Sequence, residues 1–304
     1  MVFKINILGC GSATPTLRRN PTAQVINILE RHFLIDCAEG TQLQMRKYGI
    51  KFQRINHIFI SHLHGDHFFG LIGLISTFGI LNREKELHIY GPKGIKEITT
   101  LQLKLSKSWT KYPIIFHELE SKESELIFED DKVSVYTIPL DHRVYTNGYL
   151  FKEKPKLRKL HIENIKQYDE IDTCDYHNIK AGKDVVLSTG EVISNYELTI
   201  DPPKPKSFAF CSDTAYKPDI VPIVKNVDVL YHESTFLKNR EDLCEKTKHS
   251  TAAQAASIAK QANVGKLIIG HYSSRYPNIN DFKVEANTVF KNVVLAEAGK
   301  IITS

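Results

Sequence analysis

The sequence has no apolar run long enough to cross a membrane. The longest one lies around Leu71 to Leu81 and is well short of the roughly 20 apolar residues that a membrane helix requires. The start of the chain, from Met1 to Leu8, alternates like a strand and lacks the basic beginning and long apolar core of a signal peptide. We therefore expect a cytoplasmic protein that does not act at a membrane.

Cysteine is scarce and scattered. The chain has five cysteines, an odd number, and none belongs to a Cys-x-x-Cys pair. We expect free thiols in a reducing compartment. The net charge of +5 is mild, so it permits a polyanionic partner without indicating one by itself. The shares of hydrophobic residues (42%) and charged residues (25%) are ordinary, which excludes a disordered or fibrous chain.

One stretch concentrates side chains that bind metals. Residues 62–67 read His-Leu-His-Gly-Asp-His and follow an apolar run over 55–60 that indicates a strand. The first two histidines are two positions apart and point the same way from the strand end. Gly65 then turns the chain, so that Asp66 and His67 face them before a helix begins. Imidazole and carboxylate groups are ligands of zinc and similar cations, which favours a metal site over a polar turn.

Further ligand-type side chains follow other expected strands. In a sheet covered by helices, functional groups collect beyond the carboxyl ends of the strands, where the loops converge. The residues at such ends are His62, His64, His142, Asp213, His232, Glu233 and His271. Around residues 62–67 we count five histidines and two aspartates as donors, which suits two ions that share a carboxylate better than one four-coordinate ion.

The hydrophobic patterns predict an alternation of strands and helices along most of the chain. We expect strands over 3–8, 23–29, 32–36, 55–60, 87–90, 114–119, 132–140, 207–213, 227–233, 266–271 and 293–295. We expect helices over 39–48, 68–81, 95–106 and 281–290, and another that begins at Ser250 or Thr251, both of which are good N-cap residues.

Two segments fall outside this alternation. The loop over 9–21 is rich in Gly, Pro and basic residues, and it is either a long turn or a phosphate contact. Within 152–206, residues 152–159 carry five basic side chains and one acidic one, and residues 163–175 are acidic. The segment is too apolar for a disordered linker and too short for a large core. We expect a projecting arm, or otherwise an ordinary surface insertion, within a single domain over 1–304.

The stretch 62–67 with His142, Asp213 and His271 resembles the metallo-β-lactamase superfamily. A narrower resemblance, to the short-form tRNase Z family, rests on Ser61–His67 running into Gly70-Leu71, on His232–Thr235, His249–Thr251 and His271–Tyr276, and on the insertion after His142. The resemblance implies an α/β fold of the αββα type, with two mixed sheets, outer helices and a substrate-binding arm over 152–206. It also implies a zinc-dependent endoribonuclease that removes the 3′ trailer from precursor tRNA and leaves a 3′-hydroxyl group.

The same resemblance implies roles for individual residues. It assigns His62, His64 and His142 to one zinc ion, Asp66, His67 and His271 to a second, and Asp213 to both. It makes Asp66 the acceptor of the proton from water, and His249, oriented by Glu233, the acid that protonates the leaving oxygen. For His232 the sequence leaves the role open, with support of a ligand from behind as one alternative. For substrate binding we expect Arg19, Asn20, Arg275, Lys154, Lys156 and Arg158. The resemblance also implies two Zn²⁺ ions per subunit (or Mn²⁺ or another divalent metal), precursor tRNA as partner and a homodimer. Binding of DNA is not expected.

The chain departs from the family pattern in two places. The arm has no Gly-Pro turn over 174–183, and residues 15–20 have leucine where the bacterial Pro-x-Lys-x-Arg-Asn loop has lysine. Two other functions stay open: a zinc phosphodiesterase or other hydrolase of the superfamily that acts on a small substrate, and an RNA-binding protein with a structural metal. A structural zinc site closes with four protein ligands, so the surplus of ligands and the pair of Glu233 and His249 favour an enzyme.

Overall fold

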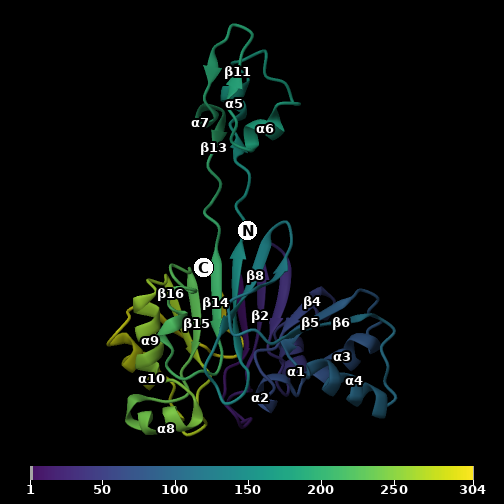
Figure 1. Ribbon diagram of the computed structural model, residues 1–304, viewed down its shortest axis with the longest axis vertical. Helices are drawn as coiled ribbons and strands as arrows, with labels where there is room; N and C mark the ends of the chain where they lie inside the picture. The colour runs from purple at the N-terminus through teal and green to yellow at the C-terminus, as the bar shows by residue number, and fades with distance from the viewer. Residues whose placement is uncertain (1–2, 304) are drawn as a thin grey trace. The chain divides into compact units, whose positions relative to one another are not determined.

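The computed structural model describes residues 3–303 and contains two seven-stranded sheets (Figure 1). The first sheet has the order β18 (Ile301–Thr303), β1 (Lys4–Gly9), β2 (Ala23–Ile28), β3 (Arg31–Ile35), β4 (Ile55–Phe59), β5 (Leu87–Pro92), β6 (Ile114–Leu119). The second has the order β17 (Val293–Leu295), β16 (Lys266–Gly270), β15 (Val229–Glu233), β14 (Ser207–Cys211), β9 (Asn147–Glu153), β8 (Val133–Pro139), β7 (Leu126–Glu129). Both sheets contain parallel and antiparallel pairs, as the expected fold class requires.

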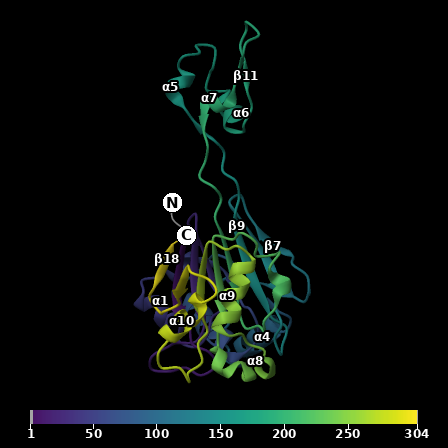
Figure 2. The same cartoon turned by 90° about the vertical axis from the view of Figure 1, so that its left-hand side faces the viewer.

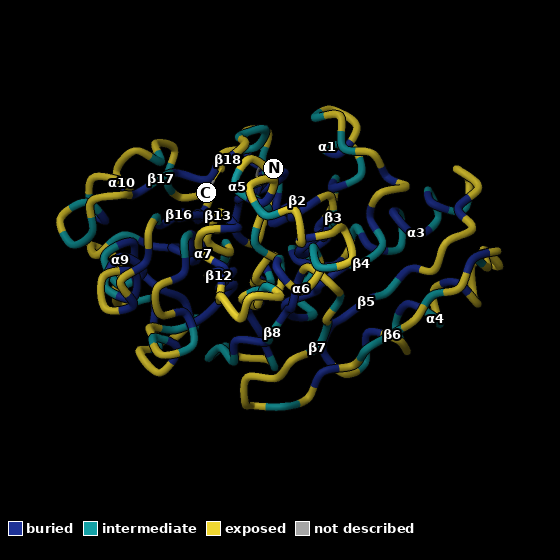
Figure 3. Tube along the Cα trace, turned by 90° about the horizontal axis from the view of Figure 1, so that it is seen from above, coloured by how far each residue is buried: buried dark blue, intermediate teal, exposed yellow. Residues whose placement is uncertain are grey.

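The side chains of a strand alternate between two hydrophobic cores. In β3, Phe33 and Ile35 belong to the core that also includes residues of the second sheet, such as Phe151 and Phe208. Leu34 points the other way and joins the core beneath the helices of the first sheet. Because successive side chains of a strand point to opposite faces, an apolar run such as Phe33–Ile35 can serve both layers. Figure 3 shows that buried residues follow the central strands.

The outer layers are helical. The helices α1 (Thr41–Lys47), α3 (Leu71–Ile80) and α4 (Ile95–Leu105) contribute to the core on the outer face of the first sheet. The helices α9 (Ala252–Gln261) and α10 (Asn280–Asn287) contact each other and strands of the second sheet (Figure 2). Thr251 caps α9 through a reciprocal pair of hydrogen bonds with Gln254, which confirms the expected start of this helix. None of the helices within residues 3–303 is long and apolar enough to cross a membrane.

The structure corrects several expected elements. The helix expected over 68–81 is two helices, α2 (Gly65–Phe68) and α3, and Gly65 begins α2. The break lies at Gly70, whose amide donates to the oxygen of Cys37 and where a Cβ atom would lie 2.0 Å from the oxygen of Ala38. The prediction missed β7, β9, β18 and the helix α8 (Glu241–Thr247). The strand expected over 3–8 spans Lys4–Gly9, and Met1 and Val2 of the alternating stretch at the start lie outside the described part of the chain.

The chain divides into two compact units, and the smaller one comprises Asp130–Lys132 and Glu153–Pro205. It holds two small antiparallel pairs, β10 (Lys159–Leu160) with β13 (Thr199–Ile200) and β11 (Val185–Val186) with β12 (Val192–Ile193). The short helices are α5 (Ile162–Ile165), α6 (Tyr176–Lys180) and α7 (Asn195–Leu198). Its small core consists of Ile165, Ile171, Ile179, Ile193 and Leu198. The segment that departs from the alternation therefore has a folded structure of its own.

Candidate active site

The residues expected as metal ligands lie together although they come from distant parts of the sequence. Four of them follow the carboxyl end of a strand: His62 follows β4, His142 follows β8, Asp213 follows β14 and His271 follows β16. The other three lie at the start of α2: His64, Asp66 and His67. Potential ligand atoms form two main groups, within each of which all atoms lie within 4.8 Å of one another. The first group is His62, His64, His142 and Asp213, and the second is Asp66, His67 and His271.

The nitrogen atoms of the first group converge. Nδ1 of His64 lies 3.0 Å from Nε2 of His62 and 3.2 Å from Nε2 of His142. In the second group, Nε2 of His67 lies 3.3 Å from Nε2 of His271, and Oδ2 of Asp66 lies 3.5 Å from the same atom of His271. Lone pairs of nitrogen that converge at these distances suit a shared cation.

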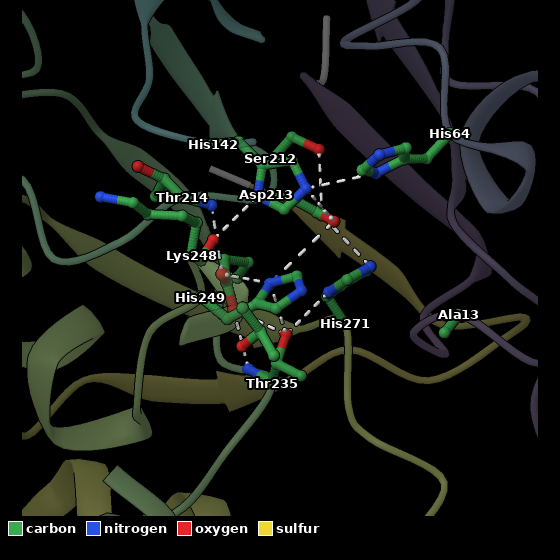
Figure 4. Close-up of polar contacts among 12 residues, drawn as sticks. Ala13, His64, His142, Ser212, Asp213, Thr214, Thr235, Lys248, His249 and His271 are labelled. Atoms are coloured by element: carbon green, nitrogen blue, oxygen red, sulfur yellow. Dashed lines mark hydrogen bonds and ion pairs between the residues drawn. The ribbon is translucent and has the colours of Figure 1, made fainter. Parts of the chain in front are cut away.

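Asp213 lies between the two groups (Figure 4). Its Oδ2 faces Nε2 of His62 at 3.6 Å, and its Oδ1 faces Nε2 of His67 at 3.3 Å and Nε2 of His271 at 3.2 Å. One carboxylate thus presents a different oxygen to each group. The side chain is 3% exposed, so a charged carboxylate here needs cationic or hydrogen-bonding neighbours.

The second ring nitrogen of four of the histidines is held by a partner behind it. Nδ1 of His67 lies 2.7 Å from the Asp36 carboxylate, and Nδ1 of His62 lies 3.0 Å from the Ser61 hydroxyl. Because the Ser61 hydroxyl donates a hydrogen bond to Asp36, it accepts the hydrogen bond from Nδ1 of His62. Such partners fix which nitrogen carries the proton and aim the other at a metal.

The partners of the other two histidines lie near residue 249. Nδ1 of His142 donates to the backbone oxygen of Lys248 at 2.9 Å. Nδ1 of His271 lies 2.9 Å from the hydroxyl of Thr235, which donates its proton to Glu233 and therefore accepts from His271. Lys248 ends α8 in the left-handed conformation, with φ 56° and ψ 55°. This uncommon conformation of a non-glycine residue presents its carbonyl group to His142.

The electrostatics of the two groups fit a divalent cation. Burial holds the pKa of His62 well below its usual value, so this imidazole is neutral and can act as a ligand. Burial raises the pKa of Asp66, but hydrogen bonds from His271 and His67 outweigh it and keep this carboxyl ionised. Burial lowers the pKa of His67, but the carboxylates of Asp213 and Asp36 outweigh burial and raise it. The raised pKa of His67 favours its protonated form in the absence of a cation. The neutral imidazole of His62 and the ionised carboxylate of Asp66 are donor types that zinc and related cations prefer.

A third set of contacts joins His249 to Glu233. Nδ1 of His249 lies 2.9 Å from Oε1 of Glu233, which is fully buried. The Glu233 carboxylate also accepts from the amides of Thr214, Thr235 and Ser250. Burial alone lowers the pKa of His249, but the charge of Glu233 and its hydrogen bond outweigh burial and raise the pKa to about 9.

His249 also lies within ligand distance of Asp213 and His271. Its Nδ1 is engaged by Glu233, however, and its Nε2 makes no hydrogen bond within residues 3–303. An imidazolium held in this way has a proton to donate, whereas a ligand needs a free lone pair. The geometry therefore favours proton transfer over ligation for this residue.

His232 is separate from this site. It is fully buried, and its Nδ1 lies 2.7 Å from the backbone oxygen of Glu233. Its Nε2 has no hydrogen-bond partner within residues 3–303. Because neighbouring side chains of a strand point to opposite faces, Glu233 reaches the site and His232 does not. The supporting role behind a ligand that the sequence left open for His232 is not seen.

The loop over 9–21 reaches the second group through its backbone. The amide of Ala13 donates to Oδ2 of Asp66 at 2.7 Å. Arg19 is only 9% exposed, and its guanidinium donates to the oxygen of Tyr276 at 2.7 Å, so here it holds two segments together. Asn20 accepts from the side chain of Gln44. Arg275 is exposed, and substrate binding by Arg19, Asn20 and Arg275 stays a prediction.

Two of the basic residues expected to bind substrate from the smaller unit have partners within it. Arg158 pairs with Asp201 and lies over the ring of Tyr196, and Lys156 lies 3.5 Å from Glu153. Lys154 donates its amide to the oxygen of Lys132. The basic stretch is thus partly neutralised by its own unit, a fact that its composition does not reveal, and contacts of these three residues with substrate stay a prediction.

The sequence interpretation missed the residues that orient the ligands. Asp36 directly follows β3, so the rule of acidic residues at strand ends points to it as well. Thr235, Ser61 and the carbonyl group of Lys248 carry no such signal, because hydroxyl and backbone groups occur everywhere in a sequence. Only their contacts with the histidines identify them.

Known proteins resemble this chain over nearly its whole length. A family model described as anti-Pycsar protein Apyc1 matches residues 3–108. A protein of Bacteroides fragilis named ribonuclease Z is 46% identical over 301 residues, which cover 99% of each chain. Ribonuclease Z of Parabacteroides distasonis is 48% identical over 297 residues and covers 98% of this chain and 97% of its own.

Solved structures give a similar result. The short form of human tRNase Z superposes with a TM-score of 0.72 at 25% identity, covering 98% of both chains. The metallo-β-lactamase fold protein YhfI of Bacillus subtilis superposes with a TM-score of 0.69 at 16% identity, covering 100% of both chains, and this likeness shows the fold alone. The αββα fold expected from the sequence is therefore confirmed.

Proposed function

Because the chain belongs to the ribonuclease Z family, we propose that it is a metal-dependent endoribonuclease that removes the 3′ trailer from precursor tRNA. The product would be a tRNA with a free 3′-hydroxyl group. The position of Asp213 supports this proposal most directly, since its two oxygens face two separate groups of ligands. A carboxylate shared in this way is typical of two-metal sites that hydrolyse phosphodiesters.

We infer which residues hold the metals. His62, His64 and His142 would bind one cation, Asp66, His67 and His271 a second, and Asp213 both. Two divalent cations, Zn²⁺ in our proposal, acidify water and stabilise negative charge on the phosphate. The outer contacts of His67, His142 and His271 keep each imidazole in the orientation that ligation requires.

Asp66 and His249 would handle the protons. Asp66 stays ionised and is held by the amide of Ala13, so it can accept a hydrogen bond from the attacking water and orient it. Its low pKa makes it a weak base, which confines its role to orienting the water and transiently accepting a proton. His249, kept protonated by Glu233, would donate a proton to the leaving 3′ oxygen of the ribose. An alkoxide is a poor leaving group, so this proton is needed in the transition state.

The test is cleavage of a precursor tRNA by the purified, zinc-loaded protein, with the cut mapped to the nucleotide. We expect one cut at the start of the trailer, competitive inhibition of bis(p-nitrophenyl) phosphate hydrolysis by the precursor, and loss of both activities after chelation. If the protein hydrolyses the small diester, does not cleave the precursor tRNA and is not inhibited by it, the site would instead act on a small substrate. Binding of RNA without either hydrolysis would leave a non-enzymatic RNA-binding protein.

We further propose that the protein acts in the cytoplasm as a homodimer. Exposed apolar side chains occur on α3, α4 and the following loop: Ile80 is 79% exposed, Leu105 73% and Trp109 61%. Ile80 and Trp109 line the same depression. Burial of such side chains against a second copy would stabilise a dimer. Light scattering of the wild type and of Trp109→Glu tests this, and a monomeric wild type at micromolar concentration contradicts it.

A further inference from the structure

A cavity of about 380 Å³ opens beside His142. Its walls come from the segment after β6, the segment between β8 and β9, and the segment after β14. The lining residues include Lys122, Asp141, His142, Arg143, Tyr145 and Lys217. His142 also belongs to the first group of candidate ligands, so the cavity begins where that group ends.

The charges around this cavity are unbalanced. Lys122 and Arg143 are exposed and form no ion pair or side-chain hydrogen bond within residues 3–303. Lys217 donates to the backbone oxygen of Pro139, which carries no net charge. Asp141 is the acidic residue of the lining, and its carboxylate already pairs with Lys248 at 3.1 Å. Cationic side chains without acidic partners beside a candidate metal site attract an anion.

The floor of the cavity is ordered by internal contacts. The hydroxyl group of Tyr145 donates to the oxygen of Ser121 at 2.8 Å and accepts from the amide of Asn147 at 2.8 Å. Asn147 is 1% exposed, and its backbone amide donates to the oxygen of Ser61, next to His62. A backbone hydrogen bond therefore connects the cavity to the end of β4, which His62 and His64 follow. A preformed cavity with a few polar groups is typical of a binding site.

Arg143 lies next to the first ligand group along the chain. Arg143 directly follows His142, whose Nε2 lies 3.2 Å from Nδ1 of His64. A group bound to Arg143 would therefore lie near any phosphate held by the two ligand groups.

We propose that this cavity is a nucleotide subsite. It would hold a nucleotide that neighbours the scissile phosphodiester, with Lys122 and Arg143 in contact with the next phosphate of the RNA. The inference rests on the proposed function, because it assumes that the two ligand groups hold a phosphodiester of an RNA chain. The guanidinium of Arg143 can bind phosphate oxygens with two hydrogen bonds at once. A diester with one phosphate has nothing to place in this subsite.

The experiment compares the double variant Lys122→Ala/Arg143→Ala with the control Lys96→Ala/Lys104→Ala. The control removes the same charge from another cavity of about 450 Å³, which is lined by residues of α4. Each zinc-loaded protein is titrated with a labelled precursor tRNA that carries a non-hydrolysable phosphonate at the cleavage position, at several salt concentrations. Zinc affinity is measured in parallel by competition with a chelator.

We expect the Kd of the double variant to rise about 10- to 100-fold, since each charge-assisted contact contributes about a factor of ten. The slope of log Kd against log salt should fall by about 0.7 to 0.9 for each lost phosphate contact. Zinc affinity should stay at the wild-type value. A Kd and slope equal to those of the control would overturn the proposal. Loss of zinc in the double variant would overturn it too, because the cations would then act on the metal site.

A second probe separates failure of this inference from failure of the proposed function. If the wild type hydrolyses bis(p-nitrophenyl) phosphate but does not cleave precursor tRNA, the proposed function fails. Uridine 5′-monophosphate then tests the cavity as an inhibitor of diester hydrolysis. Weaker inhibition of the double variant than of the control would support a nucleotide subsite, and equal inhibition would overturn it.

Discussion

Nδ1 of His249 lies 2.9 Å from Oε1 of Glu233, and both side chains are buried. This contact determines which nitrogen of His249 is engaged and keeps a proton on the ring. The Glu233 carboxylate itself is held by backbone amides from three segments, so it cannot turn away. The pair is therefore suited to donate a proton to an oxygen placed beside Asp213.

If His249 protonates the leaving oxygen, His249→Ala should lower the turnover of precursor tRNA by about 10²- to 10⁴-fold. Zinc content should stay unchanged, because His249 is not assigned as a ligand. Hydrolysis of bis(p-nitrophenyl) phosphate should fall far less, since nitrophenolate leaves as a stable anion. The measurements are kcat for both substrates and metal content by mass spectrometry. Loss of metal, or equal damage to both substrates, would remove His249 from this role.

The same pair predicts a pH dependence. The pKa of His249 is raised to about 9, so the ring is protonated below that pH and loses its proton as the pH rises through it. The kcat for precursor tRNA should therefore fall on the alkaline side. Glu233→Gln removes the charge that raises the pKa, and the falling limb should move about 1 to 3 pH units lower. Bound cations lower the pKa in both proteins, so the difference between their profiles is the quantity to measure. Identical profiles would contradict the assignment.

Asp213→Ala should abolish the activity. The mutation removes the carboxylate that faces His62 on one side and His67 and His271 on the other, so the binding of both cations weakens. Asp219→Ala, at an exposed aspartate, serves as control. Metal content and circular dichroism check that the variant folds and loses metal. Full activity with two metals bound would refute a shared carboxylate.

Lys248 should matter through its backbone. Lys248→Gly tolerates the left-handed conformation and should keep the carbonyl group of residue 248 on Nδ1 of His142. Lys248→Val disfavours that conformation more than lysine does, because a β-branched residue very rarely adopts it. The mutation should weaken zinc binding by about 10- to 100-fold, as is usual when a partner behind a ligand is lost. Lys248→Met, which removes only the charge, is the control. Chelator competition measures the affinity, and wild-type affinity in Lys248→Val would show that this carbonyl is dispensable.

The smaller unit should serve tRNA binding. Its separate core allows residues 155–200 to be replaced by a short Gly-Ser bridge while the larger unit keeps its own core. We expect KM for precursor tRNA to rise strongly and its salt dependence to flatten, with a much smaller effect on bis(p-nitrophenyl) phosphate. Since Arg158 and Lys156 already have partners within the unit, the single variant Lys159→Ala tests an exposed cation of the same stretch. Unchanged tRNA affinity and salt slope in a folded, zinc-loaded deletion variant would show that the segment has no role in tRNA binding.

The sequence by itself determined the local part of the site. Residues 62–67 concentrate ligands within one strand-to-helix connection, and their convergence follows from the short distance along the chain. The strand ends that carry His142, Asp213 and His271 could also be predicted, because apolar runs end there. The periodicity of those runs likewise indicated most strands of both sheets and the start of α9 at Thr251.

Tertiary structure decided what the pattern cannot encode. The order of the strands brings His142 and His271 to the two oxygens of Asp213, and only that order lets Asp213 present one oxygen to each group. The burial of Arg19 and the pairing of Arg158 depend on segments far away in the sequence. The carbonyl group of Lys248 orients His142 through a left-handed backbone conformation, which a lysine in the sequence does not predict. Long-range contacts of this kind arise from the packing of distant segments, so a local pattern of residue types does not predict them.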